Sequence, residues 1–266
     1  MAMRSRASFD RRTVDDLTIG DEASFRHVAL YADLKEVLRR ARYSFRLLPA
    51  ARPARADRAL LFNLTFWSAE AGGDVLVDDH VEADVIAHAA WHHLAARALA
   101  ARGAPLSVDA LFLGEAIASA FDVYLVGRLL GHSPRSTFLQ TQVPAMAETA
   151  CAAGLSKKRF ERLLGDLAAA PERGFSDLRE LLSDAAAALF ACSGSEEAFA
   201  ALAALDGRRL SCLLHRYEFS NWVLYARAYG GASGLDARAR AVDRALRRSN
   251  VALEWLATHW IAPAIK

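Results

Sequence analysis

The segment 84–130 constrains the fold most strongly, because its polar residues recur at helical spacing on both sides of a short turn. These residues are His88 and His92 in the first half, and Glu115, Ser119 and Asp122 in the second half. On a helix with about 3.6 residues per turn, each of the two sets lies on one face. Two imidazoles and a carboxylate on facing helices are ligands that divalent metal ions bind. The segment therefore predicts a helix pair with a metal site formed by His88, His92 and Glu115.

The amino-acid composition favours helices over a β-rich fold. Hydrophobic residues make up 53% of the 266 residues, whereas glycine and proline, with 15 and 7 copies, are scarce. A chain of this length buries a substantial core, as one large domain or as two small ones. The 33 basic residues nearly balance the 31 acidic ones, and the net charge of +2 gives no reason to expect nucleic acid as a partner.

No segment predicts secretion or a membrane span. The N-terminal stretch 1–17 is basic but lacks the apolar run of a signal sequence. The longest apolar stretch, 110–130, contains Glu115 and Asp122, and each charge would cost about 2.5–3.5 kcal/mol at the centre of a bilayer. The three cysteines lie far apart without a CxxC spacing, which is typical of free thiols in a reducing compartment. We therefore expect a cytoplasmic protein that does not bind membranes.

The sequence pattern divides the chain into a flexible N-terminal arm at 1–20, an α+β part at 21–135 and a helical part at 136–266. One small β-hairpin is predicted, because 59–68 and 74–79 are rich in β-branched and aromatic residues or read as extended. The fold class is therefore mainly α (α+β). Helices are predicted at 21–48, 81–101, 108–130, 138–153, 157–169, 177–191, 196–205, 208–229 and 235–260.

Two blocks, VIAHAAWHHLA (85–95) and GEAIASAFDVY (114–124), resemble the active-site helices of the gluzincin metallopeptidases, the thermolysin-like group. In that family the first helix has the pattern VxxHExxH, and a glutamate on the following helix is the third zinc ligand. The resemblance assigns His88 and His92 as the histidine ligands and Glu115 as the glutamate ligand of a zinc ion. Ser119 stands where the family has an aspartate that supports a ligand, and Asp122, one turn further on, is its substitute.

The resemblance covers about 58–130, and the fold that it implies is a zincin-like helix pair with a small β-hairpin, followed by a helical C-terminal part. The strand 60–67 resembles the edge strand along which gluzincin substrates lie, so a peptide or protein partner is expected to bind there by strand addition. Gluzincins stabilise the transition state with a histidine or tyrosine from a later helical region. His215 and Tyr217 are the residues that the resemblance suggests for this catalytic role, although 213–231 also has the pattern of an amphipathic core helix.

The residue after the first histidine departs from the family pattern. The glutamate that serves there as the general base is replaced by Ala89. Loss of a general base removes a factor of about 10²–10⁴ in rate. Three nearby residues are candidates to supply a base instead, namely His93, Glu82 and Asp122. The sequence therefore predicts a divalent-metal-binding, gluzincin-like protein whose peptidase activity is atypical or lost, which is the character of a pseudoenzyme.

Three other interpretations stay open. Two histidines and a carboxylate also form the ligand set of non-haem iron enzymes, in which iron takes the place of zinc. A non-enzymatic helical binding or scaffold protein would keep the zincin-like shape without a metal. In a third interpretation, His88 and His92 pair directly with Glu115 and Asp122, with nitrogen–oxygen distances of about 2.8 Å. Metal ligands instead lie about 2.0–2.2 Å from a shared ion.

Overall fold

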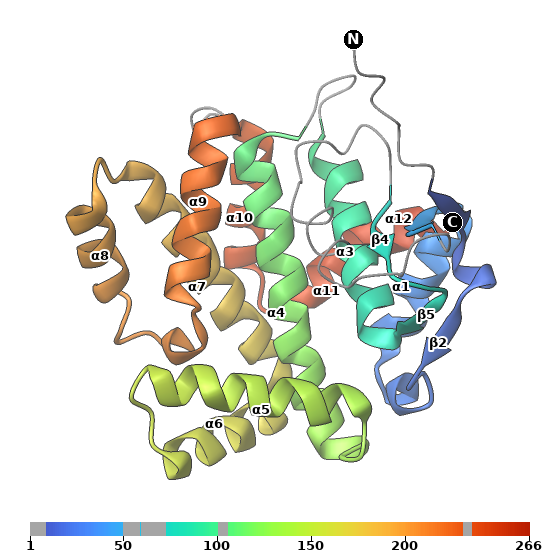
Figure 1. The fold of residues 1–266 in the computed structure, drawn as a ribbon, viewed down its shortest axis with the longest axis horizontal. Helices are drawn as coiled ribbons and strands as arrows, with labels where there is room; N and C mark the ends of the chain where they lie inside the picture. The colour runs from blue at the N-terminus through green and yellow to red at the C-terminus, as the bar shows by residue number, and fades with distance from the viewer. Residues whose placement is uncertain (1–8, 50–58, 60–72, 101–105, 231–235) are drawn as a thin grey trace.

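The computed structural model describes residues 9–49, 59, 73–100, 106–230 and 236–266. Within these residues the protein is mainly helical, as predicted, with short strands gathered at one end (Figure 1). The α-helices are α1 (Ala29–Arg40), α3 (Ala83–Leu99), α4 (Val108–His132), α5 (Thr137–Ala152), α6 (Lys157–Ala169), α7 (Pro171–Ala191), α8 (Ser195–Ala203), α9 (Arg216–Gly230), α10 (Ala237–Arg248), α11 (Ala252–Leu256) and α12 (Ala262–Ile265). Other helical segments are the 3₁₀ turns η1 (Val14–Asp16), η2 (Ser24–His27) and η4 (Ser211–Leu213), and the π-helix η5 (Ala257–Ile261).

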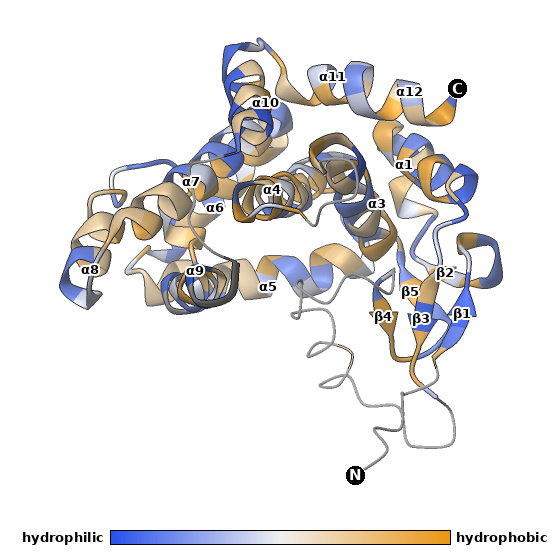
Figure 2. Ribbon diagram, turned by 90° about the horizontal axis from the view of Figure 1, so that it is seen from above, coloured by the Kyte–Doolittle hydropathy of each residue, from blue (hydrophilic) through white to orange (hydrophobic). Residues whose placement is uncertain are grey.

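The long helix α4 lies at the centre of the molecule. Its first turn is capped by Ser107, whose hydroxyl accepts a hydrogen bond from the backbone N–H of Ala110 at 3.1 Å. Because α4 is apolar on nearly every side, α3 and α7 pack against it from different directions, and α6 and α10 also contact it (Figure 2). Among the described helices it alone is long and apolar enough to cross a membrane, and 72% of its most apolar window is buried inside the protein.

Gly127 lets α4 approach the junction of α6 and α7. A Cβ atom at this position would lie 2.4 Å from the carbonyl oxygen of Leu167 and 2.9 Å from the Cβ atom of Pro171. Pro171 is the first residue of α7, where its missing N–H costs no helical hydrogen bond. The helix predicted to begin at 177 therefore begins at Pro171, and its first turn packs on α4.

The main hydrophobic core crosses the predicted boundary at 135. Ile86 and Ile117 belong to the same buried cluster as Leu246 and Trp260, which come from the helical C-terminal part. A smaller cluster joins α7, α8 and α9 through residues such as Leu189. The helix pair is thus held by side chains from both ends of the chain.

The strands form two small sheets beside α1 and α3. They are β1 (Asp10–Arg12), β2 (Thr18–Gly20), β3 (Phe45–Leu47), β4 (Val75–Leu76) and β5 (His80–Glu82). In one sheet β3 pairs antiparallel with β1 and parallel with β4, and in the other β2 pairs parallel with β5. The prediction of a flexible arm is therefore wrong for β1 and β2. Strands of two or three residues are too short to show an alternating pattern, so only their distant partners define them.

The predicted hairpin is only partly within the described residues. Of the segment 74–79, Val75–Leu76 forms the strand β4, and among the described residues it pairs in parallel with β3. The other predicted strand, 59–68, and with it the proposed partner-binding edge 60–67, lies outside the described residues except for Ala59.

The helix predicted at 21–48 is shorter than its hydrophobic pattern suggests. The chain makes the turn η2 before α1 begins at Ala29, and α1 ends at Arg40. Arg42 adopts a φ of 48°, a left-handed conformation that turns the chain into β3. The predicted helix at 235–260 likewise divides into α10, α11 and η5, and the one at 208–229 divides into η4 and α9.

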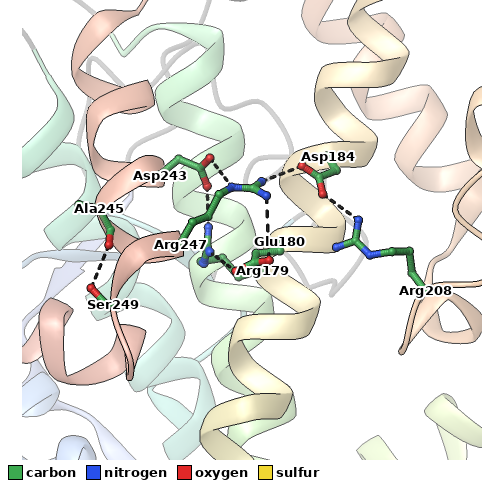
Figure 3. A network of polar contacts seen from close by, with 8 residues as sticks. All are labelled: Arg179, Glu180, Asp184, Arg208, Asp243, Ala245, Arg247 and Ser249. Carbon is green, nitrogen blue, oxygen red and sulfur yellow. Dashed lines mark hydrogen bonds and ion pairs between the residues drawn. The ribbon is translucent and has the colours of Figure 1, made fainter.

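A network of ion pairs fastens α10 to α7 (Figure 3). Arg179 is fully buried, and its guanidinium donates hydrogen bonds to Asp243 at 2.6 Å and to Glu180 at 3.1 Å. Arg247 bridges the same helices, with donor–acceptor distances of 2.8 Å to Asp243 and 2.7 Å to Asp184. The network fixes the position of α7, which lines both cavities described below.

Asp21 ties the start of η2 to the start of α5. Its carboxylate accepts hydrogen bonds from the hydroxyls of Ser24 and Ser136, each at 2.5 Å. Burial disfavours the charged carboxylate, but the hydrogen bonds outweigh this effect and hold the pKa of Asp21 below its usual value.

Candidate metal centre

The helix pair α3 and α4 positions every predicted metal ligand. His92 of α3 faces Glu115, and His88, one turn earlier, faces Asp122, so the two helices run in opposite directions. The ring centroids of His88 and His92 are 4.8 Å apart, as the four-residue spacing on one face requires.

His88, His92 and Glu115 form one compact group. One ligand atom of each lies within 4.8 Å of the ligand atoms of the other two. In the part of the chain that the structure describes, no other set of three histidine, cysteine or acidic residues meets this condition. The Nε2 atom of His92 is 3.3 Å from Oε2 of Glu115, and the three side chains are partly buried. The structure therefore brings together the residues that the sequence pattern assigned to a metal.

Two further side chains hold the group in place. Ser119 donates a hydrogen bond from Oγ to Oε1 of Glu115 at 2.8 Å. Asp122 lies with Oδ2 at 3.2 Å from Nδ1 of His88. A histidine that donates Nδ1–H to a carboxylate keeps a lone pair on Nε2, which is the form that binds a metal. Ser119 thus contacts Glu115, and Asp122, the suggested substitute for the family's aspartate, contacts His88.

Neighbouring charges set the protonation of the metal group. Burial raises the pKa of Glu115, but the hydrogen bond and charge of His92, with the charge of His88, outweigh it and lower the pKa to about 2. Burial lowers the pKa of His88, but the charge of Asp122 and its hydrogen bond raise the pKa to about 9. At neutral pH the carboxylate of Glu115 is therefore ionised and the imidazole of His88 is protonated, so a metal ion that binds His88 replaces the proton on its Nε2 atom.

Asp84 lies on the same face of α3 as His88 and His92, and it was not predicted as a site residue. Burial and then the charge of Asp122 raise the pKa of Asp84 to about 6. It lies one turn before His88 on α3, so 84, 88 and 92 recur at intervals of four. The four-residue spacing was the signal in the sequence that Asp84 belongs to the site. An acid in the first turn of a helix is also explained by its favourable interaction with the helix dipole.

Position 89 faces the core, not the metal group. The Ala89 side chain is 3% exposed and belongs to the main hydrophobic cluster together with Ala90 and Trp91. A glutamate at this position would be buried among apolar side chains. Position 89 therefore differs from the gluzincin pattern in two ways, because its residue is alanine and because its side chain lies in the apolar core.

The residues named as substitute bases are placed differently from one another. His93 lies outside the group, with its ring edge-on to Tyr43 at a centroid distance of 5.4 Å. Burial, and then the charge of Arg97, lowers the pKa of His93. Glu82 precedes α3 and accepts a hydrogen bond from the hydroxyl of Thr137 at 3.0 Å. Of the three candidates, only Asp122 touches the group.

A cleft of about 180 Å³ opens beside Glu115. It is lined by Phe112, Glu115, Ala116 and Ser119 of α4, Leu178 and Leu182 of α7, Leu213 of η4, Leu214 and His215 between η4 and α9, and Glu218, Phe219 and Trp222 of α9. His215 thus lies on the same cleft as a predicted metal ligand, and its Nε2 atom is 3.0 Å from the hydroxyl of Thr149. Tyr217 is in α9, and its side chain lies outside the described part of the structure.

Comparison of the chain with known proteins gives no further assignment. No protein-family model, curated protein or solved structure matches it. The likeness to the gluzincins thus remains one of short motifs.

Proposed function

We propose that the protein binds one divalent metal ion, zinc in the first instance, through His88, His92 and Glu115. Their residue types are those that hold catalytic zinc with an open coordination position. Ser119 and Asp122 supply the outer hydrogen bonds that such ligands usually have.

The observation that carries the proposal is the spacing of the ligand atoms. Two ligands at about 2.1 Å from a tetrahedral ion are about 3.4 Å from each other. The His92–Glu115 separation is 3.3 Å, close to this value. The limit of 4.8 Å on the whole group means that small side-chain rotations suffice to bring all three atoms onto one ion.

The chemistry proposed for the site is that of a gluzincin-like protein with atypical or lost peptidase activity. A bound zinc ion supplies Lewis-acid polarisation of an oxygen ligand. The protein supplies no glutamate after the first histidine, since Ala89 stands there, and this side chain faces the core. Asp122 already pairs with His88. We therefore expect the zinc-loaded protein to hydrolyse peptides slowly or not at all, and to act mainly by binding a ligand in the cleft.

The direct contacts between the histidines and the carboxylates favour a second candidate, a helix pair stabilised by these contacts without any metal. The distances from His88 to Asp122 and from His92 to Glu115 are 3.2 Å and 3.3 Å. They are longer than a short hydrogen bond of about 2.8 Å and slightly shorter than the separation of about 3.4 Å between two ligands of one ion. In that case the protein is a helical binding or scaffold protein. Iron bound by the same three ligands would instead indicate a non-haem iron enzyme.

Metal content distinguishes these candidates. The purified protein is incubated with excess zinc or iron, passed through a desalting column and measured by plasma mass spectrometry. We expect about one equivalent of zinc in the wild type, as a single three-ligand site requires. The His88→Ala/His92→Ala double variant should lose it. If the wild-type protein retains no metal, the role left for His88, His92 and Glu115 is to stabilise the helix pair.

Two variants control this experiment. His132→Ala removes an exposed histidine of α4 that stacks on His27, and it should leave the zinc content unchanged. Asp122→Asn keeps the shape of the side chain but weakens its support of His88, so zinc affinity should fall about 10–100-fold. Equal loss of zinc in His132→Ala would place the metal elsewhere.

A further inference from the structure

A second cavity lies next to the cleft beside Glu115. It has a volume of about 140 Å³ and lies between α4, α7 and α10, whereas the cleft beside Glu115 lies between α4, α7 and α9. Figure 2 looks along α4 and shows α10 and α9 on opposite sides of α7. The two cavities are therefore neighbours that share the walls formed by α4 and α7.

Phe112 is the side chain common to both cavities. It contacts Phe190 edge-on at a centroid distance of 5.7 Å, and Phe190 lines only the second cavity. It also contacts Phe219 edge-on at 6.1 Å, and Phe219 lines only the cleft beside Glu115. Contacts of this kind stabilise a ring in one orientation. Phe112 thus forms the partition between the cleft and the second cavity.

The polarity of the lining changes from the metal group towards Phe112. Near the metal group the cleft presents the carboxylate of Glu115 and the hydroxyl of Ser119. Around Phe112 the exposed surface of both cavities is mainly apolar, with Ala116 and Leu182 in the cleft and Ala186 in the second cavity. The second cavity also has polar and charged residues in its lining, namely Asp109, Ser183, Arg240 and Asp243. A ligand that fits has a polar head at Glu115 and an apolar tail that points to Phe112.

We propose that the two cavities are the halves of one site for a small molecule with a metal-binding head and an unbranched apolar tail, and that Phe112 sets the longest tail accepted. The head depends on the proposed function, because it binds the metal at His88, His92 and Glu115. The tail depends only on the cavities and Phe112.

The volumes give the expected length limit. A cavity of about 150 Å³ holds benzene, which has six carbon atoms, so the cleft accepts a tail of about six carbons. Each buried methylene group strengthens binding about fourfold. In the wild type, affinity should rise about fourfold per carbon up to this length and then stay constant. Removal of the Phe112 ring joins the second cavity to the first, and the rise should continue for several further carbons.

The test is a titration calorimetry series with zinc-loaded protein and straight-chain alkyl hydroxamates of two to twelve carbons. The wild type should show a break in the affinity series, Phe112→Leu a later break, and Phe112→Ala the latest. Ser183→Ala is the matched control, because Ser183 lines only the second cavity and the change keeps both ring contacts of Phe112, so its break should coincide with that of the wild type. Affinity without dependence on tail length, or the same break in Phe112→Ala as in the wild type, would overturn the proposal.

Failure of the metal site would be visible separately. If the protein retains no zinc, the same length series is measured with 1-alkanols on metal-free protein, as the shift in melting temperature that each produces. A break that moves in Phe112→Ala would then support the tail site while the metal proposal fails. Melting temperatures that do not depend on alkanol length would overturn the tail site as well.

Discussion

Replacing Ala89 by glutamate restores the gluzincin motif in sequence, and the structure predicts that it damages the protein instead. Ala89 is 3% exposed. A glutamate in such a site remains neutral, and holding it neutral at pH 7 against an ordinary pKa of about 4.3 costs about 4 kcal/mol. Overpacking adds about 1–3 kcal/mol. The total is a large part of the roughly 5–15 kcal/mol by which proteins of this kind are stable.

Urea unfolding followed by circular dichroism measures this cost. The matched control is Val85→Glu, on the same helix at a position 36% exposed, where a change within about 0.5 kcal/mol is expected. The deficit of Ala89→Glu should shrink by about 3 kcal/mol between pH 7 and pH 5, because the free energy needed to protonate the glutamate falls by about 1.4 kcal/mol for each pH unit. An Ala89→Glu variant as stable as the wild type, which cleaves peptides when loaded with zinc, would refute the burial of this position.

Three further perturbations test the packing and the charges. Gly127→Ala should destabilise the protein by about 1–3 kcal/mol in urea unfolding, because of its contact with a backbone carbonyl. Gly131→Ala, which meets nothing within 4 Å, should be neutral or stabilising, and equal effects would contradict the close approach. Asp243→Ala should cost about 3–5 kcal/mol because it leaves the buried guanidinium of Arg179 with one carboxylate, whereas Arg179→Met should cost much less, and the reverse order would contradict this account. The pKa of Asp21 is lowered in the folded state, so its contribution is present above about pH 4 and is lost as the pH falls further; the stability difference between wild type and Asp21→Asn should shrink from pH 7 to pH 3, and a constant difference would contradict this.

The helix pair was predictable because its signals are local. The capping serine Ser107 and the four-residue spacing of His88 and His92 are set by neighbours in sequence, and α3 and α4 have nearly the predicted bounds. The pairing of Asp122 with His88 also follows from spacing, once the two helices are placed in opposite directions.

The strands and the cleft were not predictable from the same patterns. β1 and β2 each have three residues, and each is defined by a partner that lies more than thirty residues away in sequence. The cleft beside Glu115 depends on how α7 and α9 pack on α4, and Phe112 is common to both cavities only because α10 lies where Arg179 and Arg247 hold it. The direction in which Ala89 points depends on which face of α3 is covered, and the motif does not contain that information.

X-ray absorption at the zinc edge tests the central claim most directly, because it counts the atoms around the metal. The account predicts two imidazole nitrogens at about 2.0–2.1 Å and a carboxylate oxygen at about 2.0–2.2 Å, with the imidazole signal absent in the His88→Ala/His92→Ala variant. A sulfur ligand at about 2.3 Å would contradict it, as would an unchanged spectrum in that variant.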